Sequence, residues 1–134
     1  MPIEIVKLLP ANENNIRKVI ESVCAITGVR EVDMMSKSRL RDNVSARNMC
    51  FSILRSGLGM TYMSIGAYFG KHHATIMYAI KANDNDVDSN IAYRSRFEQI
   101  LSFVGINYAE QITHGDAITL IVENMFRREP IVID

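Results

Sequence analysis

The segment from Thr61 to Ala82 reads TYMSIGAYFGKHHATIMYAIKA and is the most informative stretch of the chain. Its apolar residues form two short helical patterns, in which neighbours are three or four positions apart. These residues are Ile65 and Phe69 in the first pattern, then Ile76 and Ile80 in the second. Gly70 lies between them, and glycine readily adopts the left-handed conformation that ends a helix. Two short helices joined by a glycine turn predict a helix-turn-helix.

The start of the second helix carries the chemistry expected of this motif. We expect this helix to begin at about His72 or His73, and Gly66 to let the two backbones approach closely because it lacks a Cβ. The exposed start reads KHHAT over residues 71–75, which supplies a cation, two imidazole rings, a methyl group and a hydroxyl. Such groups suit phosphate oxygens and base edges in a DNA major groove.

The charged residues are unevenly distributed, although 15 cations balance 15 acids over the whole chain. Residues 37–82 contain seven cations and one acid, a net charge of +6. Residues 1–36 carry a net charge of −1, and residues 83–134 carry −5. A basic centre in an otherwise acidic chain is typical of a face that binds a polyanion. A solvated basic face without a partner is the alternative.

Helical periodicity in the flanking sequence predicts a small all-α domain. Further helices are expected from Asn14 to Thr27, from Ser45 to Gly57, from about Tyr93 to Val104, and from Asp116 to Pro130, with a short helical turn near Val32. Ser36–Asn43 is expected to be a loop, and Asn83–Asp88 an acidic linker. We divide the chain into an N-terminal arm (1–12), a helix-turn-helix domain (13–104) and a C-terminal helical extension (105–134).

The two cysteines, Cys24 and Cys50, lie in helical apolar patterns. We expect reduced thiols in the core of a cytoplasmic protein, with a disulfide or a metal pair as the alternative. No apolar run approaches the roughly 20 residues of a membrane span. The first four residues lack the basic and apolar regions of a secretory signal.

Two blocks of sequence resemble the C-terminal DNA-binding domain of the bacterial replication initiator DnaA. The first is SKSRLR at residues 36–41, followed by ARNM at 46–49, which is similar to the family's basic loop and the helix behind it. The second is IGAYFGKHHATIMYA at residues 65–79, which is similar to the family signature. The blocks are separated by the family's own distance. The resemblance covers roughly two-thirds of the chain and implies double-stranded DNA as the partner.

The resemblance assigns roles to individual residues. Arg39 matches the arginine that enters the minor groove, and arginine suits that narrow, negative groove. Contacts to phosphates and backbone are assigned to Lys37, Arg47, Asn48, Lys71 and Thr75. Base reading is assigned to His72, His73 and Ala74. The basic block also contributes Arg41, and Thr61 at the start of the first helix completes the predicted DNA-binding set.

Two residues depart from the family signature. His72 replaces an aspartate, and Ala74 replaces a threonine. A carboxylate accepts from cytosine N4, whereas histidine presents different groups. We therefore expect this chain not to read the family's nine-base box with the usual preference.

The sequence does not predict an enzyme. It contains no Gly-x-x-x-x-Gly-Lys-Ser/Thr phosphate loop, so the initiator's ATPase module is absent from these 134 residues. No Ser-His-Asp or paired-carboxylate spacing stands out. No cofactor is expected, and His72 with His73 is an unsuitable metal pair because adjacent side chains on a helix point in different directions.

The sequence is compatible with three functions. The first is a sequence-preferring DNA-binding regulator of transcription or replication in a bacterium, phage or mobile element. The second is an oligomeric adaptor or assembly protein, such as a phage packaging subunit, in which residues 106–134 would form a homo-oligomer. The third is a DnaA-like scaffold that contacts only protein.

Overall fold

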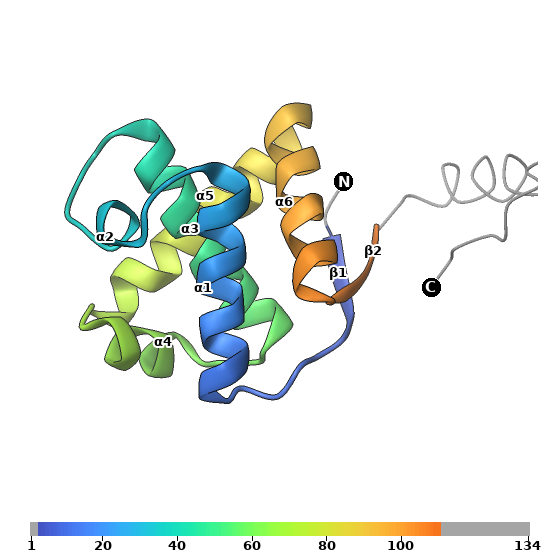
Figure 1. Ribbon diagram of the computed structural model, residues 1–134, viewed down its shortest axis with the longest axis horizontal. Helices are drawn as coiled ribbons and strands as arrows, with labels where there is room; N and C mark the ends of the chain where they lie inside the picture. The colour runs from blue at the N-terminus through green and yellow to red at the C-terminus, as the bar shows by residue number, and fades with distance from the viewer. Residues whose placement is uncertain (1–2, 111–134) are drawn as a thin grey trace, which may run out of the picture.

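The computed structural model describes residues 3–110, which form six helices and two short strands (Figure 1). In chain order they are β1 (Ile3–Lys7), α1 (Glu13–Thr27), α2 (Glu31–Met34), α3 (Arg41–Gly57), α4 (Tyr62–Phe69), α5 (His73–Ser89), α6 (Ile91–Val104) and β2 (Asn107–Glu110). Helices dominate, which confirms the prediction of a small all-α domain. None of the helices in residues 3–110 has the length and apolar character needed to cross a membrane.

The helix α3 is the centre of the core, and it packs against α1 and α5. Phe51 of this helix is fully buried, and so is its apolar stripe, which consists of Ala46, Met49, Cys50, Ile53 and Leu54. Because consecutive positions from Asn48 to Leu54 are all buried, the middle of α3 is surrounded by protein on every side. Cys50 lies in this core as a free thiol, and burial raises its pKa. Cys24 is also free and half-buried.

Several predicted helix ends are confirmed. Gly28 and Gly70 end α1 and α4 in the left-handed conformation, with φ values of 74° and 66°. Thr61 caps α4, because its side-chain oxygen accepts a hydrogen bond from the Ser64 backbone N–H at 3.0 Å. The short helical turn predicted near Val32 is α2.

Two predicted boundaries were wrong. The helix α3 begins at Arg41 rather than after a Ser45 cap, so the second half of the predicted loop is helical. Its first three residues are polar, and Arg41 and Asp42 are solvent-exposed, so they add nothing to the apolar stripe. The helix α5 continues to Ser89 rather than ending at Ala82. The buried face of α5 extends through Asn83 and Val87, which are separated in the sequence by the acids of the predicted linker.

The strands β1 and β2 form an antiparallel pair that sequence reasoning did not predict. Ile3 pairs with Glu110 and Ile5 with Tyr108, so the start of the described chain is joined to the segment after α6. The strand β2 lies at the beginning of the segment expected to be a helical extension. The helix expected from Asp116 lies outside the described residues, and the predicted domain boundaries stay predictions.

Candidate nucleic-acid interface

The turn between α4 and α5 is fixed by a close approach at Gly66. The Lys71 backbone N–H donates to the Gly66 carbonyl oxygen at 2.8 Å. A Cβ added at Gly66 would lie 2.4 Å from the Lys71 carbonyl oxygen, which leaves no room for a side chain. Glycine is therefore required here, as the sequence predicted, and the left-handed Gly70 completes the turn.

The predicted contact between the two helices of this motif is present in the core. Ile65 of α4 and Ile76 of α5 are both fully buried in one hydrophobic cluster. Phe69 packs against this cluster, and its ring lies 5.3 Å from the ring of Phe51 on α3. These contacts attach α4 and α5 to the central helix, so the start of α5 has a defined position on the domain.

The start of α5 presents the residues that the sequence singled out. His73 and Thr75 are exposed, and Ala74 is half-buried. His72 is exposed and is the N-cap of α5, because its Nδ1 accepts a hydrogen bond from the Ala74 backbone N–H at 3.1 Å. The rings of His72 and His73 lie 4.3 Å apart and are tilted by 32°.

The basic loop, residues 36–40, is held in place by Arg47 of α3. The Arg47 Nε donates to the Met34 carbonyl oxygen at 2.9 Å, and one Nη donates to the Ser38 carbonyl oxygen at 2.8 Å. Lys37 and Arg39 are exposed on this loop. Burial lowers the pKa of Arg47. The family resemblance assigned Arg47 to phosphate binding, and in the structure two of its donors position the loop.

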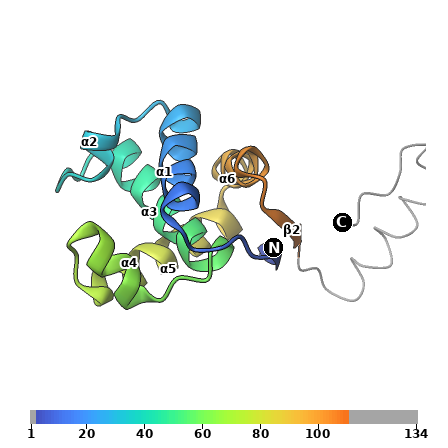
Figure 2. The same cartoon turned by 60° about the horizontal axis from the view of Figure 1, so that its bottom comes forward.

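The basic loop and the start of α5 lie on one side of the molecule. Figures 1 and 2 show the loop after α2 and the α4–α5 turn on the side opposite β1 and β2. Burial lowers the pKa of the Lys71 ammonium, and repulsion from Arg47 and Lys37 lowers it further. That repulsion requires the three cations to be near one another. An anion placed among them would relieve the repulsion.

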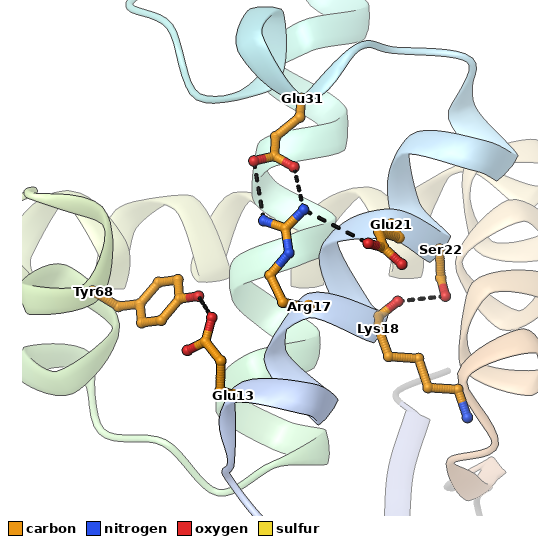
Figure 3. A network of polar contacts seen from close by, with 7 residues as sticks. All are labelled: Glu13, Arg17, Lys18, Glu21, Ser22, Glu31 and Tyr68. Atoms are coloured by element: carbon orange, nitrogen blue, oxygen red, sulfur yellow. Dashed lines mark hydrogen bonds and ion pairs between the residues drawn. The ribbon is translucent and has the colours of Figure 1, made fainter.

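The helix α1 supports both halves of this face through the polar contacts in Figure 3. Arg17 donates two hydrogen bonds to the Glu31 carboxylate, at 2.8 and 3.1 Å, which joins α1 to α2 just before the basic loop. The Tyr68 hydroxyl donates to Glu13 at 2.7 Å, which joins α1 to α4. One helix therefore contacts the element before the loop and the first helix of the motif.

The remaining predicted residues differ in their surroundings. Arg41 is exposed in the first turn of α3 and lines a pocket with Arg96 of α6. Asn48 is only 7% exposed, so it offers little surface to a ligand. Thr61 is exposed, with its side-chain oxygen engaged in the α4 cap. The structure brings Lys37, Arg47 and Lys71 together, whereas Asn48 belongs to the core.

Sequence reasoning missed the residues that position the interface. Arg17 and Glu31 are 14 positions apart, and Glu13 and Tyr68 are 55 apart, so no local pattern joins them. Arg55 was counted only as part of the basic segment. Its guanidinium lies 4.7 Å from the centre of the Tyr62 ring and donates to the Met60 carbonyl oxygen at 3.1 Å, which supports the connection between α3 and α4.

These features define the class of the protein. It is a helix-turn-helix domain of the DNA-binding type, in which a fixed basic loop lies on the same side as the start of the second helix. Comparison with known proteins gives the family. Residues 16–82 match the family described as the bacterial DnaA protein helix-turn-helix. This match covers half of the chain, and the chain belongs to that family.

The chain is also similar to curated chromosomal replication initiator proteins DnaA. It is 25% identical to DnaA 1 of Protochlamydia amoebophila over 72% of this chain and 22% of that protein. It is 29% identical to DnaA of Leptospira biflexa over 61% of this chain and 19% of that protein. With DnaA of Gloeobacter violaceus the identity is 41%, over 46% of this chain and 14% of that protein. The chain therefore spans less than a quarter of the length of these relatives, and the resemblance predicted from the two sequence blocks is confirmed.

Proposed function

We propose that this chain binds double-stranded DNA with a sequence preference and regulates replication or transcription in the cytoplasm. The first residues of α5 would face base edges in the major groove, and the loop at residues 36–40 would reach the adjacent minor groove with Arg39. Membership of the DnaA helix-turn-helix family supports this assignment.

One observation carries the proposal. Lys71, at the start of α5, is close enough to Lys37 and Arg47 for their charges to lower its pKa. Like charges that repel one another in the free protein cost folding free energy, and a phosphate backbone would offset that cost. Within residues 3–110, the charged groups that shift the pKa of Lys71 are the cations Arg47 and Lys37, and none is an acid. The arrangement therefore favours a polyanion.

Binding to duplex DNA over a series of salt concentrations tests the proposal. If about five phosphates are neutralised, the logarithm of the association constant should fall with the logarithm of the salt concentration with a slope near −4 to −5. Fluorescence anisotropy with a labelled duplex measures this slope. Absence of binding at low salt would overturn the proposal.

One variant in the basic loop and one at the start of α5 test which residues contact the DNA. Arg39→Ala and Lys71→Ala should each weaken binding and reduce the size of the slope by about one, as expected when a phosphate contact is lost. Lys18→Ala is the matched control, because Lys18 is an exposed cation on α1 and is not among the predicted DNA contacts. Equal DNA affinities for all three variants would contradict the assignment of Arg39 and Lys71 to the DNA interface. For the scaffold that contacts only protein, Arg39→Ala and Lys71→Ala should leave the affinity for the protein partner unchanged.

A further inference from the structure

The hydrogen bond that caps α5 determines which nitrogen of His72 carries a proton. Nδ1 accepts from the Ala74 backbone N–H at 3.1 Å, so it holds a lone pair and no hydrogen. A neutral imidazole with an unprotonated Nδ1 carries its hydrogen on Nε2. In a doubly protonated imidazole the Nδ1–H would face the Ala74 backbone N–H, and the capping hydrogen bond could not form. The free edge of His72 is therefore a hydrogen-bond donor and has no acceptor.

Two contacts fix the direction of this donor. The cap holds one edge of the ring against the first turn of α5, a helix of 17 residues. The ring of His73 lies 4.3 Å away, measured between ring centres, with an interplanar angle of 32°. The ring is otherwise exposed to solvent. A side chain held at two points loses less conformational entropy when it binds a third group.

An N–H donor at this position selects a base with an acceptor, whereas a carboxylate at the same position selects a base with a donor. The residues at the start of a recognition helix meet base edges in the major groove. Guanine presents two acceptors there, O6 and N7, and no donor. Adenine and thymine present one acceptor each, N7 beside an amino donor and O4 beside a methyl group, and cytosine presents the N4 amino donor. A single N–H donor is therefore best matched by guanine. An aspartate in the same place could cap the helix equally well, but its remaining oxygen would accept from cytosine.

We propose that His72 is a specificity-determining residue that donates from Nε2 to guanine at one position of the bound DNA. This inference rests on the proposed DNA binding, and it adds the identity of one base. The Nε2–H edge pairs with O6 or N7 and has no group that accepts from a cytosine amino group. The preference at this base pair is therefore reversed relative to a chain with aspartate at the same position.

Selection of duplexes from a random pool tests the inference, with the full chain as wild type, His72→Asp and Tyr78→Asp. We expect one position to be guanine for the wild type and cytosine for His72→Asp, with at least about fivefold discrimination in each case. Tyr78→Asp adds the same negative charge at an exposed position further along α5, and it leaves both the cap and the His73 ring in place. It should leave guanine at that position.

The outcomes separate the two proposals. If the wild type binds no duplex, the proposed function fails and the inference fails with it. If the wild type binds but the position keeps the same base in His72→Asp, only the inference is overturned. Thermal unfolding of each variant, followed by circular dichroism, establishes that the change in preference comes from a folded protein.

A spectroscopic measurement tests the tautomer without DNA. Long-range ¹H–¹⁵N correlation spectra of the free protein in mildly alkaline buffer distinguish protonated from unprotonated ring nitrogens. We expect the signals of the Nε2–H form for His72. Signals of the Nδ1–H form would overturn the inference even if the protein binds DNA.

Discussion

At Gly66 the α4–α5 turn leaves no space for a methyl group, because an added Cβ would lie 2.4 Å from the Lys71 carbonyl oxygen. That neighbour is backbone, so the turn itself would have to move. Alanine is the better helix former by about 1 kcal/mol, and the forced displacement exceeds this gain. For Gly66→Ala we expect a net loss of about 1–2 kcal/mol of stability and weaker DNA binding, measured by urea unfolding and anisotropy.

Gly28→Ala is the matched control for this prediction. Gly28 also has a positive φ of 74°, but no atom lies within 4 Å of an added Cβ. The substitution should cost about 1–2 kcal/mol through backbone strain alone. DNA affinity should be unchanged, because α1 ends away from the α4–α5 turn. Loss of affinity in both variants, or in neither, would contradict the role assigned to Gly66.

At the scale of single elements, the basic loop depends on the two donors that Arg47 directs at backbone carbonyl oxygens. Lysine keeps the positive charge but has one compact head group, which cannot reproduce the planar fork of arginine. In Arg47→Lys we therefore expect a looser loop, with faster tryptic cleavage after Lys37 and Arg39 and weaker DNA binding. Arg96→Lys, at an exposed position on α6, should leave both measurements unchanged.

The pairing of α1 with α2 predicts a pH dependence. The hydrogen bonds from Arg17 lower the pKa of Glu31. A lowered pKa in the folded state adds stability above the unfolded pKa of about 4.3, and this stability is lost as the pH falls through the folded value. The side chains are 40% and 47% exposed, so the contribution at neutral pH is below about 1 kcal/mol.

Glu31→Gln should therefore be slightly less stable than the wild type at neutral pH and equally stable well below pH 4. Urea unfolding at both pH values measures the difference. Glu21→Gln is the comparison, because Glu21 is 71% exposed and lies 3.8 Å from the same guanidinium. Its effect should be smaller. A constant difference between Glu31→Gln and the wild type at all pH values would contradict the ion-pair explanation.

At the scale of the whole molecule, local sequence patterns predicted the helices whose ends carry a glycine or a capping side chain, such as Gly28, Thr61 and Gly70. They failed where a helix end had no such marker. The helix α3 begins after Leu40, whose side chain makes no cap. The helix α5 continues past Ala82 through a segment that contains three acids, each exposed or half-buried.

The rest of the site was not accessible from local patterns, because it depends on contacts between distant residues. The strand pairing joins Ile3 to Glu110, and Tyr68 reaches Glu13 across 55 positions. The resemblance to the DnaA family assigned Arg47 and Asn48 to the DNA surface. The structure shows that Arg47 donates a hydrogen bond to the loop backbone and that Asn48 is buried.

The oligomeric state distinguishes the proposed regulator from the adaptor predicted as its alternative. The adaptor depends on residues 106–134, most of which lie outside the described part of the chain. For a regulator we expect a monomer or a dimer in light scattering at micromolar concentration. A ring or a larger assembly would favour the adaptor, and removal of residues 111–134 should then return the chain to a smaller species.

The strand pairing has a practical consequence for protein engineering. Ile3 and Glu110 face each other in the β1–β2 pair, on the side of the molecule opposite the basic loop (Figures 1 and 2). A short linker could therefore join these two points, and new termini could be opened elsewhere on the surface. In such a circular permutant, a fluorophore placed at the old junction would report on the fold from a point far from any bound duplex.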